Sequence, residues 1–427
     1  QMLDPQNQIS QHKNDKVIII ALFIGSNSSD NQYQLEELER LINTLGGHVI
    51  DRIVQYRKNI DSKFYFGKGK LKNIFEYAIE QNCKYIVINN DVSPSQIKNI
   101  QSYFKDKAFI KDRTGIILDI FDKHAKTKEA KTQIKLAQLE YLLPRLTRQW
   151  THLERQMGGI GTRGGPGETQ IEIDRRLVRN QIIKLKKQLA KILNARKTQK
   201  KNRKNIYKVS LIGYTNAGKS TIMKCLSNKD VYIKDELFAT LDTNTKRIKI
   251  NKKNSFIISD TVGFIRNLPD NLIASFRSTL GELIDSDLLL KIIDISSLEY
   301  EMHLESIDTV LNHLEINHKK YLIVFNKIDQ FKNKVLTKNL KKRYPNALFV
   351  SAYNNTNINS ILDSINILMN QGNISKTIYI PYTKTKLVDD IYQNCQVLKR
   401  EDNKLNIKFQ VSGQREKIDN IIEKIKK

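Results

Sequence analysis

The chain has 427 residues and a formal net charge of +27 at pH 7. This length is too great for one ordinary hydrophobic core and predicts about two to four domains. The excess of lysine and arginine favours an anionic partner, with nucleic acid ahead of a membrane, although a lysine-rich codon bias would give the same total. The three cysteines are far apart and form no C-x-x-C pair, which argues against a disulfide framework or a zinc site and fits a reducing cytosol. The longest apolar run is much shorter than the ~20 residues of a membrane helix.

Residues 1–122 alternate between apolar runs and helix-patterned stretches. The run at residues 17–24 predicts a buried first strand. Ser93 predicts a helix start, with Pro94 in the first turn and Gln96 at the capping-box position. Strands that alternate with helices predict a small parallel α/β domain. This part of the sequence contains no Walker-type phosphate loop of its own.

Residues 123–207 predict two long helices joined by a glycine-rich loop at residues 158–167, which forms the tip of an antiparallel hairpin. The first helix is expected to run to about residue 155, with a kink or break at Pro144. A run of positive charges without acidic partners is destabilised by repulsion unless a polyanion lies near. The second helix is therefore predicted to contact RNA rather than to serve only as a solvated linker. The basic residues of this helix, expected at residues 168–197, and of its exit have no intervening acid; they are Arg175, Arg176, Arg179, Lys184, Lys186, Lys187, Lys191, Arg196, Lys197, Lys200, Lys201, Arg203, Lys204 and Lys208.

Residues 208–372 contain the phosphate-binding signature G-x-x-x-x-G-K-S, between an apolar strand at residues 209–212 and a helix. The glycines let backbone N–H groups point at a polyphosphate, and Lys219 adds a fixed positive charge. The Ser220 hydroxyl is a hard oxygen ligand of the kind that Mg²⁺ prefers. The predicted nucleotide site is lined by Gly213, Tyr214, Thr215, Asn216, Ala217, Gly218, Lys219, Ser220 and Thr221.

Two further segments complete the phosphate side of this site. In Asp260-Thr261-Val262-Gly263, the carboxylate can hold Mg²⁺ through water, and the glycine leaves its N–H open to the γ-phosphate. In Phe238-Ala239-Thr240-Leu241-Asp242, the Thr240 hydroxyl is expected to complete the Mg²⁺ shell in the GTP state, in preference to Thr243. A helix-capping role for either threonine is the alternative. The predicted catalytic residues are Lys219, Thr240 and Gly263, and the predicted metal ligands are Ser220 and Thr240.

The base side of the site is expected in Asn326-Lys327-Ile328-Asp329, after the fourth apolar strand of this region. The Asp329 carboxylate can accept from guanine N1–H and N2–H, donors that adenine lacks, while Lys327 can lie along the base plane. This segment therefore selects GTP over ATP. Ser351-Ala352-Tyr353, after the next strand, can bring a backbone N–H to guanine O6. The recurring strands predict a doubly wound sheet with its ligand at the strands' carboxyl ends.

Phe264 stands directly after Gly263, where Ras-like GTPases carry the glutamine that orients the attacking water. A phenylalanine side chain cannot hydrogen-bond water. We therefore expect slow intrinsic hydrolysis and a partner that completes the site.

Residues 373–427 show strand, helix, strand and helix patterns and predict a small C-terminal α/β module. No residue pattern in this module signals chemistry.

Several stretches resemble the HflX-type GTPases, a ribosome-associated family in the translation-factor-related class of P-loop GTPases. They are Asp112-Arg113-Thr114, residues 117–121, residues 137–146, residues 158–176 with their G-E-T-Q, residues 238–242 and residues 260–265. The similarity covers nearly the whole chain. The loop Arg163-Gly164-Gly165-Pro166-Gly167 is one glycine longer than the family's usual R-G-P-G.

The resemblance implies a multidomain α/β protein that hydrolyses GTP with Mg²⁺, binds the large ribosomal subunit and its RNA, and splits stalled or idle ribosomes under stress. Hydrolysis would be stimulated by the ribosome and would control release. The free protein would be a cytoplasmic monomer, and the resemblance leaves partial membrane association open.

Two other functions stay open at this point. One is an ATP-dependent remodeller of ribosomal RNA, against which the missing N-terminal phosphate loop argues. The other is a non-catalytic RNA-binding scaffold, against which the intact Lys219, Ser220, Asp260 and Asp329 argue.

Overall fold

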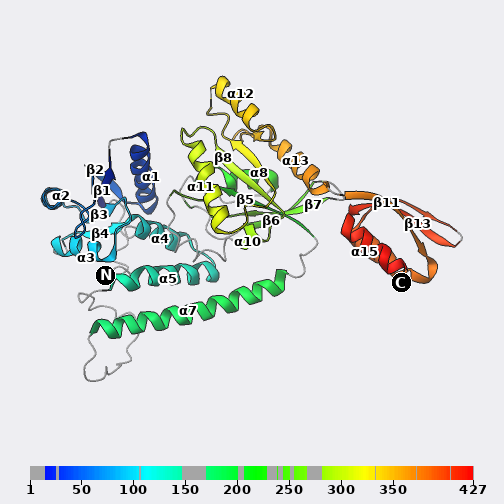
Figure 1. The fold of residues 1–427 in the computed structure, drawn as a ribbon, viewed down its shortest axis with the longest axis horizontal. Helices are drawn as coiled ribbons and strands as arrows, with labels where there is room; N and C mark the ends of the chain where they lie inside the picture. The colour runs from blue at the N-terminus through cyan, green and yellow to red at the C-terminus, as the bar shows by residue number, and fades with distance from the viewer. Residues whose placement is uncertain are drawn as a thin grey trace.

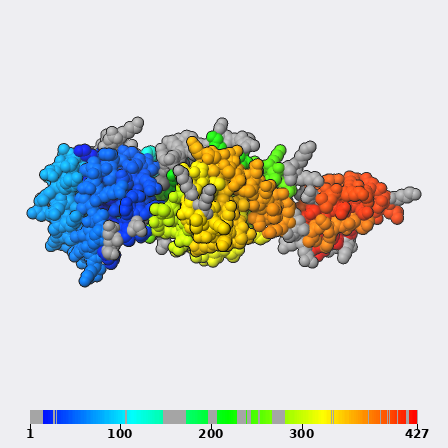
Figure 2. Space-filling model, turned by 90° about the horizontal axis from the view of Figure 1, so that it is seen from above, coloured from blue at the N-terminus to red at the C-terminus, as the bar shows by residue number. Residues whose placement is uncertain are grey.

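The structure is a computed structural model that describes residues 15–25, 28–104, 107–146, 170–200, 206–227, 238, 244–250, 254–266, 281–331, 333–371, 373–403 and 405–426. The N-terminal domain lies at one end, the phosphate-loop domain in the centre and the C-terminal module at the other end (Figures 1 and 2). The predicted multidomain α/β fold is confirmed. None of the described helices is long and apolar enough to cross a membrane.

The N-terminal domain is a parallel four-stranded sheet of order β2-β1-β3-β4, covered by helices on both faces. In β1, odd-numbered residues from Val17 to Phe23 pack with α1 and α4, and even-numbered residues from Ile18 to Leu22 pack with α2 and α3. The capping box at Ser93 is present as predicted. The elements are β1 (Lys16–Ile24), α1 (Ser29–Leu45), β2 (His48–Arg57), α2 (Lys68–Glu80), β3 (Tyr85–Ile88), α3 (Pro94–Tyr103), β4 (Phe109–Asp112) and α4 (Arg113–His124).

The helical hairpin consists of α5 (Lys128–Leu142), a 3₁₀ turn η3 (Leu143–Arg145) and α7 (Gln170–Lys200). The two helices lie side by side (Figure 1) and bury a seam of Leu136, Leu139, Leu142, Leu146, Val178 and Ile182. We expected the first helix to reach about residue 155, but α5 ends at Leu142. Pro144 in the following turn has no N–H for an α-helical hydrogen bond, which explains the early stop. The glycine-rich tip at residues 158–167 lies outside the described residues.

The phosphate-loop domain has a six-stranded sheet of order β10-β9-β8-β5-β7-β6, in which β6 alone is antiparallel to its neighbour. Its strands are β5 (Tyr207–Gly213), β6 (Asn244–Lys249), β7 (Ser255–Asp260), β8 (Leu288–Asp294), β9 (Tyr321–Asn326) and β10 (Leu348–Phe349). Sequence reasoning missed β6, because this edge strand buries only Ile248 and so carries no apolar run.

Helices cover both faces of this sheet. One face packs on α8 (Lys219–Ser227) and α13 (Ile358–Asn370). The other packs on α10 (Gly281–Ile284), α11 (Tyr300–His313) and α12 (Lys334–Arg343). The second of these cores is continuous with apolar residues of α1 and α4, so the N-terminal domain and the phosphate-loop domain share a buried interface.

The C-terminal module is an antiparallel sheet of order β11-β13-β12 with two helices on one face. Its elements are β11 (Asn373–Pro381), the 3₁₀ turn η5 (Tyr382–Lys384), α14 (Lys386–Asn394), β12 (Gln396–Asp402), β13 (Asn406–Gln414) and α15 (Arg415–Lys426). The expected order of strand, helix, strand and helix is incomplete, because the stretch after α14 forms a hairpin of two strands rather than one.

Candidate nucleotide site

The phosphate loop joins β5 to α8 and depends on two glycines. A Cβ atom at Gly213 would lie 2.4 Å from the carbonyl oxygen of Ile292, so only glycine lets β5 approach β8 this closely. Gly218 has φ +91°, and a Cβ there would lie 2.2 Å from Nδ2 of Asn326. Gly213 is therefore required by the close approach of two strands and Gly218 by the backbone conformation of the loop, which is the kind that wraps a polyphosphate.

Lys219 begins α8 and its side chain is buried against the loop. Its Nζ donates to the carbonyl oxygens of Gly213 at 3.1 Å and Tyr214 at 2.8 Å. Burial lowers the pKa of the Lys219 ammonium to about 8, although the nearby Asp260 carboxylate opposes this shift. The amine is therefore held at the loop in a poorly solvated position. A bound anion there would stabilise the protonated, positively charged form of the amine.

Ser220 and Asp260 bring two oxygen ligands together beside the loop. Asp260 ends β7, which pairs with β5, and its Oδ2 accepts a hydrogen bond from Ser220 Oγ at 2.5 Å. A hydroxyl next to a carboxylate is the donor set that Mg²⁺ prefers, and the site's chemistry fits this ion. Thr240, the other predicted metal ligand, lies outside the described residues, as do Ala239, Leu241 and Asp242.

The segment after Asp260 lies directly on the phosphate loop. Thr215 N–H donates to the Phe264 carbonyl at 2.7 Å, and Phe264 N–H donates to the Gly213 carbonyl at 3.0 Å. A Cβ at Gly263 would lie 3.0 Å from Lys219 Nζ, so the Gly263 backbone lies next to the Lys219 amine. The Phe264 side chain is buried in the core shared with the N-terminal domain, and it cannot orient water there.

Three other predicted residues on the phosphate side are buried. The Thr261 hydroxyl donates to the Leu211 carbonyl at 2.7 Å, which gives this side chain a role in holding β7 to β5. Val262 packs in the core shared with the N-terminal domain. Phe238 stacks edge-on with Phe121 of α4, with ring centroids 4.7 Å apart.

Asn326 connects the base side of the site to the phosphate side. Its Nδ2 donates to the Ala217 carbonyl at 2.9 Å, and its Oδ1 accepts from Ala352 N–H at 3.0 Å. Within the segment expected to bring a backbone N–H to guanine O6, the Ala352 amide is thus engaged by Asn326.

The other base-side residues form a polar rim. Asp329 Oδ1 accepts from Ser351 Oγ at 2.5 Å, which fixes the orientation of the carboxylate. Lys327, at φ +64°, pairs through Nζ with Asp294 Oδ2 at 2.7 Å, a partner that sequence reasoning missed. Ile328 is partly buried, while the Tyr353 side chain is 87% exposed.

Sequence reasoning also missed the contact between the loop and the N-terminal domain. The Tyr214 hydroxyl donates to the Glu37 carboxylate of α1, across a sequence separation of 177 residues. The Tyr214 ring stacks on His303 of α11, with centroids 4.0 Å apart. Glu37 lies on a helix rich in acidic and polar residues, so no sequence signal distinguished it from its neighbours.

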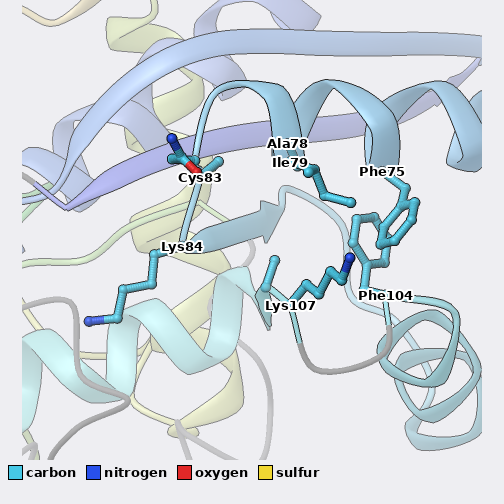
Figure 3. Close-up of a pocket in the computed structure, with 9 residues that line it drawn as sticks. Phe75, Ala78, Ile79, Cys83, Lys84, Phe104 and Lys107 are labelled. Atoms are coloured by element: carbon cyan, nitrogen blue, oxygen red, sulfur yellow. The ribbon is translucent and has the colours of Figure 1, made fainter.

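A separate hollow of about 360 Å³ lies in the N-terminal domain, away from these residues (Figure 3). Phe75, Ile79 and Phe104 line it together with Cys83, whose thiol pKa is raised to about 11 by burial. Lys84 and Lys107 also line it, but it has no glycine-rich loop between a strand and a helix, the feature that marks a nucleotide phosphate site.

Comparisons with known proteins agree with this geometry. Family models match residues 32–122 as a GTP-binding GTPase N-terminal region, residues 124–203 as a GTP-binding GTPase middle region and residues 208–327 as a 50S ribosome-binding GTPase.

Curated relatives named GTPase HflX match most of the chain, and two of them serve as examples. The protein from Flavobacterium psychrophilum is 41% identical over 392 residues, which cover 87% of this chain and 93% of that protein. The protein from Escherichia coli K12 is 36% identical over 370 residues, which cover 86% of each. A crystal structure of a GTP-binding protein from Sulfolobus solfataricus with GDP is 26% identical, covers 83% of this chain and 99% of its own, and has a TM-score of 0.41.

The family models and the curated relatives confirm the resemblance and the assignment of GTP hydrolysis, and they do not favour the alternative of an ATP-dependent RNA remodeller. The chain therefore belongs to the HflX family of GTPases.

Proposed function

We propose that this GTPase binds the large ribosomal subunit through its basic hairpin and dissociates stalled or idle ribosomes under stress, with GTP hydrolysis controlling release. The observation that carries the proposal is the charge of α7. Val178 and Ile182 pack against α5, while Arg175, Arg179, Lys184, Lys187 and Lys191 are exposed. A basic surface of this kind matches the phosphate backbone of ribosomal RNA. The description of the matched family model, a 50S ribosome-binding GTPase, points to the same partner.

The nucleotide chemistry follows from the geometry of the loop. Lys219 would bind the outer phosphates, Asp329 would read guanine, and Asn326 would keep the two sides of the site in register. Ser220 and Thr240 would hold Mg²⁺ directly and Asp260 would hold it through water, and the ion would neutralise phosphate charge when bound. Because the Phe264 side chain is buried, the attacking water would be oriented by the ribosome, which gives hydrolysis its dependence on the partner.

The first experiment measures GTP turnover of the protein alone and with large ribosomal subunits, with Lys219→Ala as the inactive control. Strong stimulation is expected. Sedimentation of intact ribosomes with the protein and GTP then tests splitting, for which separate subunits are expected. Equal turnover with and without subunits would contradict the ribosome-coupled function.

A second experiment tests the basic helix by the salt dependence of binding to large subunits. Replacement of Lys184, Lys187 and Lys191 by alanine should make the slope of log K against log salt shallower by about 0.7 to 1 per lost phosphate contact. The matched control replaces Lys338, Lys341 and Lys342, exposed lysines of α12, and should leave the slope unchanged. Equal slopes for both variants would remove α7 from the proposed interface.

A further inference from the structure

The hydroxyl of Tyr214 connects the phosphate loop to the N-terminal domain. It donates to Glu37, whose carboxylate also pairs with the guanidinium of Arg113. All three side chains are buried. Burial and the neighbouring Glu37 raise the pKa of the Tyr214 hydroxyl well above its ordinary value, so this group is a permanent donor.

The same hydroxyl also holds the segment that follows Gly263. It accepts a hydrogen bond from the backbone N–H of Arg266 at 2.7 Å. The Arg266 side chain reaches α1 as well, where Nη2 donates to Asp30 Oδ2 at 3.1 Å. One hydroxyl therefore joins a carboxylate of the N-terminal domain, the phosphate loop and the backbone beyond Gly263.

We infer that Glu37 is a positioning residue for GTP: through Tyr214 it holds residues 263–266 against the phosphate loop, where Gly263 meets the third phosphate. The Gly263 backbone already lies beside Lys219, the group proposed above to bind the outer phosphates. GDP has no third phosphate and does not need Gly263. The contact between the domains therefore sets the preference between GTP and GDP. The inference rests on GTP binding and goes beyond any action on ribosomes.

The experiment compares equilibrium binding of GTPγS and GDP to the full chain and to Tyr214→Phe, which removes only the hydroxyl. Loss of one buried hydrogen bond corresponds to about a three- to tenfold change in an equilibrium constant. We expect GTPγS to bind about three- to tenfold more weakly to the variant while GDP affinity changes less than about twofold. The kcat/KM for GTP should fall with GTPγS affinity. Equal weakening of both nucleotides, no change, or tighter GTPγS binding would overturn the inference.

Tyr141→Phe is the matched control for this change. Tyr141 is a buried tyrosine whose hydroxyl donates to a carboxylate oxygen, Asp112 Oδ1, at 2.6 Å, away from the phosphate loop. Tyr141→Phe should leave the ratio of GTPγS affinity to GDP affinity unchanged. An equal shift in this control would assign the effect to general loss of stability and overturn the inference.

Two variants of Glu37 separate the hydrogen bond from the charge. Glu37→Leu and Glu37→Gln both leave Arg113 without its carboxylate partner, but only glutamine keeps an acceptor for Tyr214. We expect the leucine variant to reproduce the Tyr214→Phe shift and the glutamine variant to show less than half of it. Identical shifts would contradict positioning through the Tyr214 hydroxyl.

Hydrogen exchange of the unmodified protein gives a test that needs no variant. If Glu37 favours GTP binding, GTP binding must favour the Glu37 contact by the same factor, because coupling between two sites is reciprocal. Amides of residues 33–40 in α1 should exchange more slowly with GTPγS than with GDP. Equal exchange in the two states would overturn the inference. These measurements contain no ribosomes, so a failure here leaves the proposed function untouched, and the reverse also holds.

Discussion

The side-chain amide of Asn326 donates to the carbonyl oxygen of Ala217 at 2.9 Å, and its oxygen accepts from the backbone N–H of Ala352 at 3.0 Å. One buried residue at the end of β9 thus joins the phosphate loop to the loop beyond β10. The base side and the phosphate side of the nucleotide site are held in register by this side chain.

Replacement of Asn326 by alanine should weaken GDP binding by about ten- to a hundredfold, because two buried hydrogen bonds of roughly 1 kcal/mol each are lost and their partners stay unsatisfied. Titration with a fluorescent GDP analogue measures the change. Asn99→Ala is the matched control. Its side-chain amide also donates to a backbone carbonyl, that of Lys63 at 2.8 Å, but on the surface of the N-terminal domain. Unchanged affinity in Asn326→Ala would show that the two loops keep their places without this residue.

Asp329→Asn should exchange the base preference of the site. An amide nitrogen facing guanine N2–H₂ places two donors against each other, whereas xanthine has a carbonyl at that position. We expect GDP affinity to fall by at least about a hundredfold and xanthosine diphosphate to bind in its place. Competition between the two nucleotides measures this exchange. Retained preference for GDP would mean that Asp329 does not read the base.

Ser351→Ala tests the orientation of the same carboxylate. It removes the hydroxyl that donates to Asp329 Oδ1 and should cost about three- to tenfold in GDP affinity without admitting xanthosine diphosphate. An exchange of base preference in this variant would contradict the assignment of base reading to the carboxylate itself.

His303 should make the folded protein less stable in mild acid. Burial lowers its pKa to about 4, whereas a histidine in the unfolded chain has a pKa near 6.5, so between these values the unfolded chain binds a proton that the folded protein does not. The free energy of unfolding therefore falls as the pH decreases from about 6.5 to about 4, by up to about 3 kcal/mol. Urea unfolding at pH 7 and pH 4.5 measures the loss.

His303→Gln should remove this contribution, so its stability should change less with pH than that of the unmodified protein. His48→Gln, at an exposed position, is the control and should leave the pH dependence as it is. If both variants lose stability in acid as steeply as the parent, a group other than His303 is responsible.

The sequence predicted the phosphate loop, the segment at Asp260 and the base-reading segment because each is a local pattern at the end of an apolar strand. Their meeting in space follows from the parallel sheet, in which β5, β7 and β9 end at one edge. The edge strand β6 and the hairpin of the C-terminal module were missed, since neither carries a continuous apolar run.

The contacts between domains could not be predicted from the sequence. Tyr214 and Glu37 meet where α1 faces the phosphate-loop domain. The polar residues that α1 contributes there, Asp30, Tyr33 and Glu37, have helical spacing, but the sequence does not show which residues they meet. The role of Asp294 as the partner of Lys327 was missed for a similar reason, because an acid at the end of a strand has many possible partners. Local patterns thus predicted the residues of the candidate nucleotide site, and tertiary packing decides which side chains hold them.

Lys219 should make nucleotide affinity fall in mildly alkaline solution. The pKa of its ammonium is lowered to about 8 by burial, and bound phosphates favour the charged amine. Below pH 8 the amine is already protonated, and binding needs no proton. Above pH 8 binding must take up a proton, so GDP affinity should fall by up to about tenfold per pH unit. Titrations at pH 7, 8 and 9 measure the slope.

Lys219→Arg keeps its charge throughout this range and should bind with little dependence on pH, whatever its absolute affinity. Parallel profiles for the two proteins would show that the Lys219 ammonium does not titrate here, and that the loop's own carbonyl groups, at 2.8 and 3.1 Å, solvate it well enough to offset its burial.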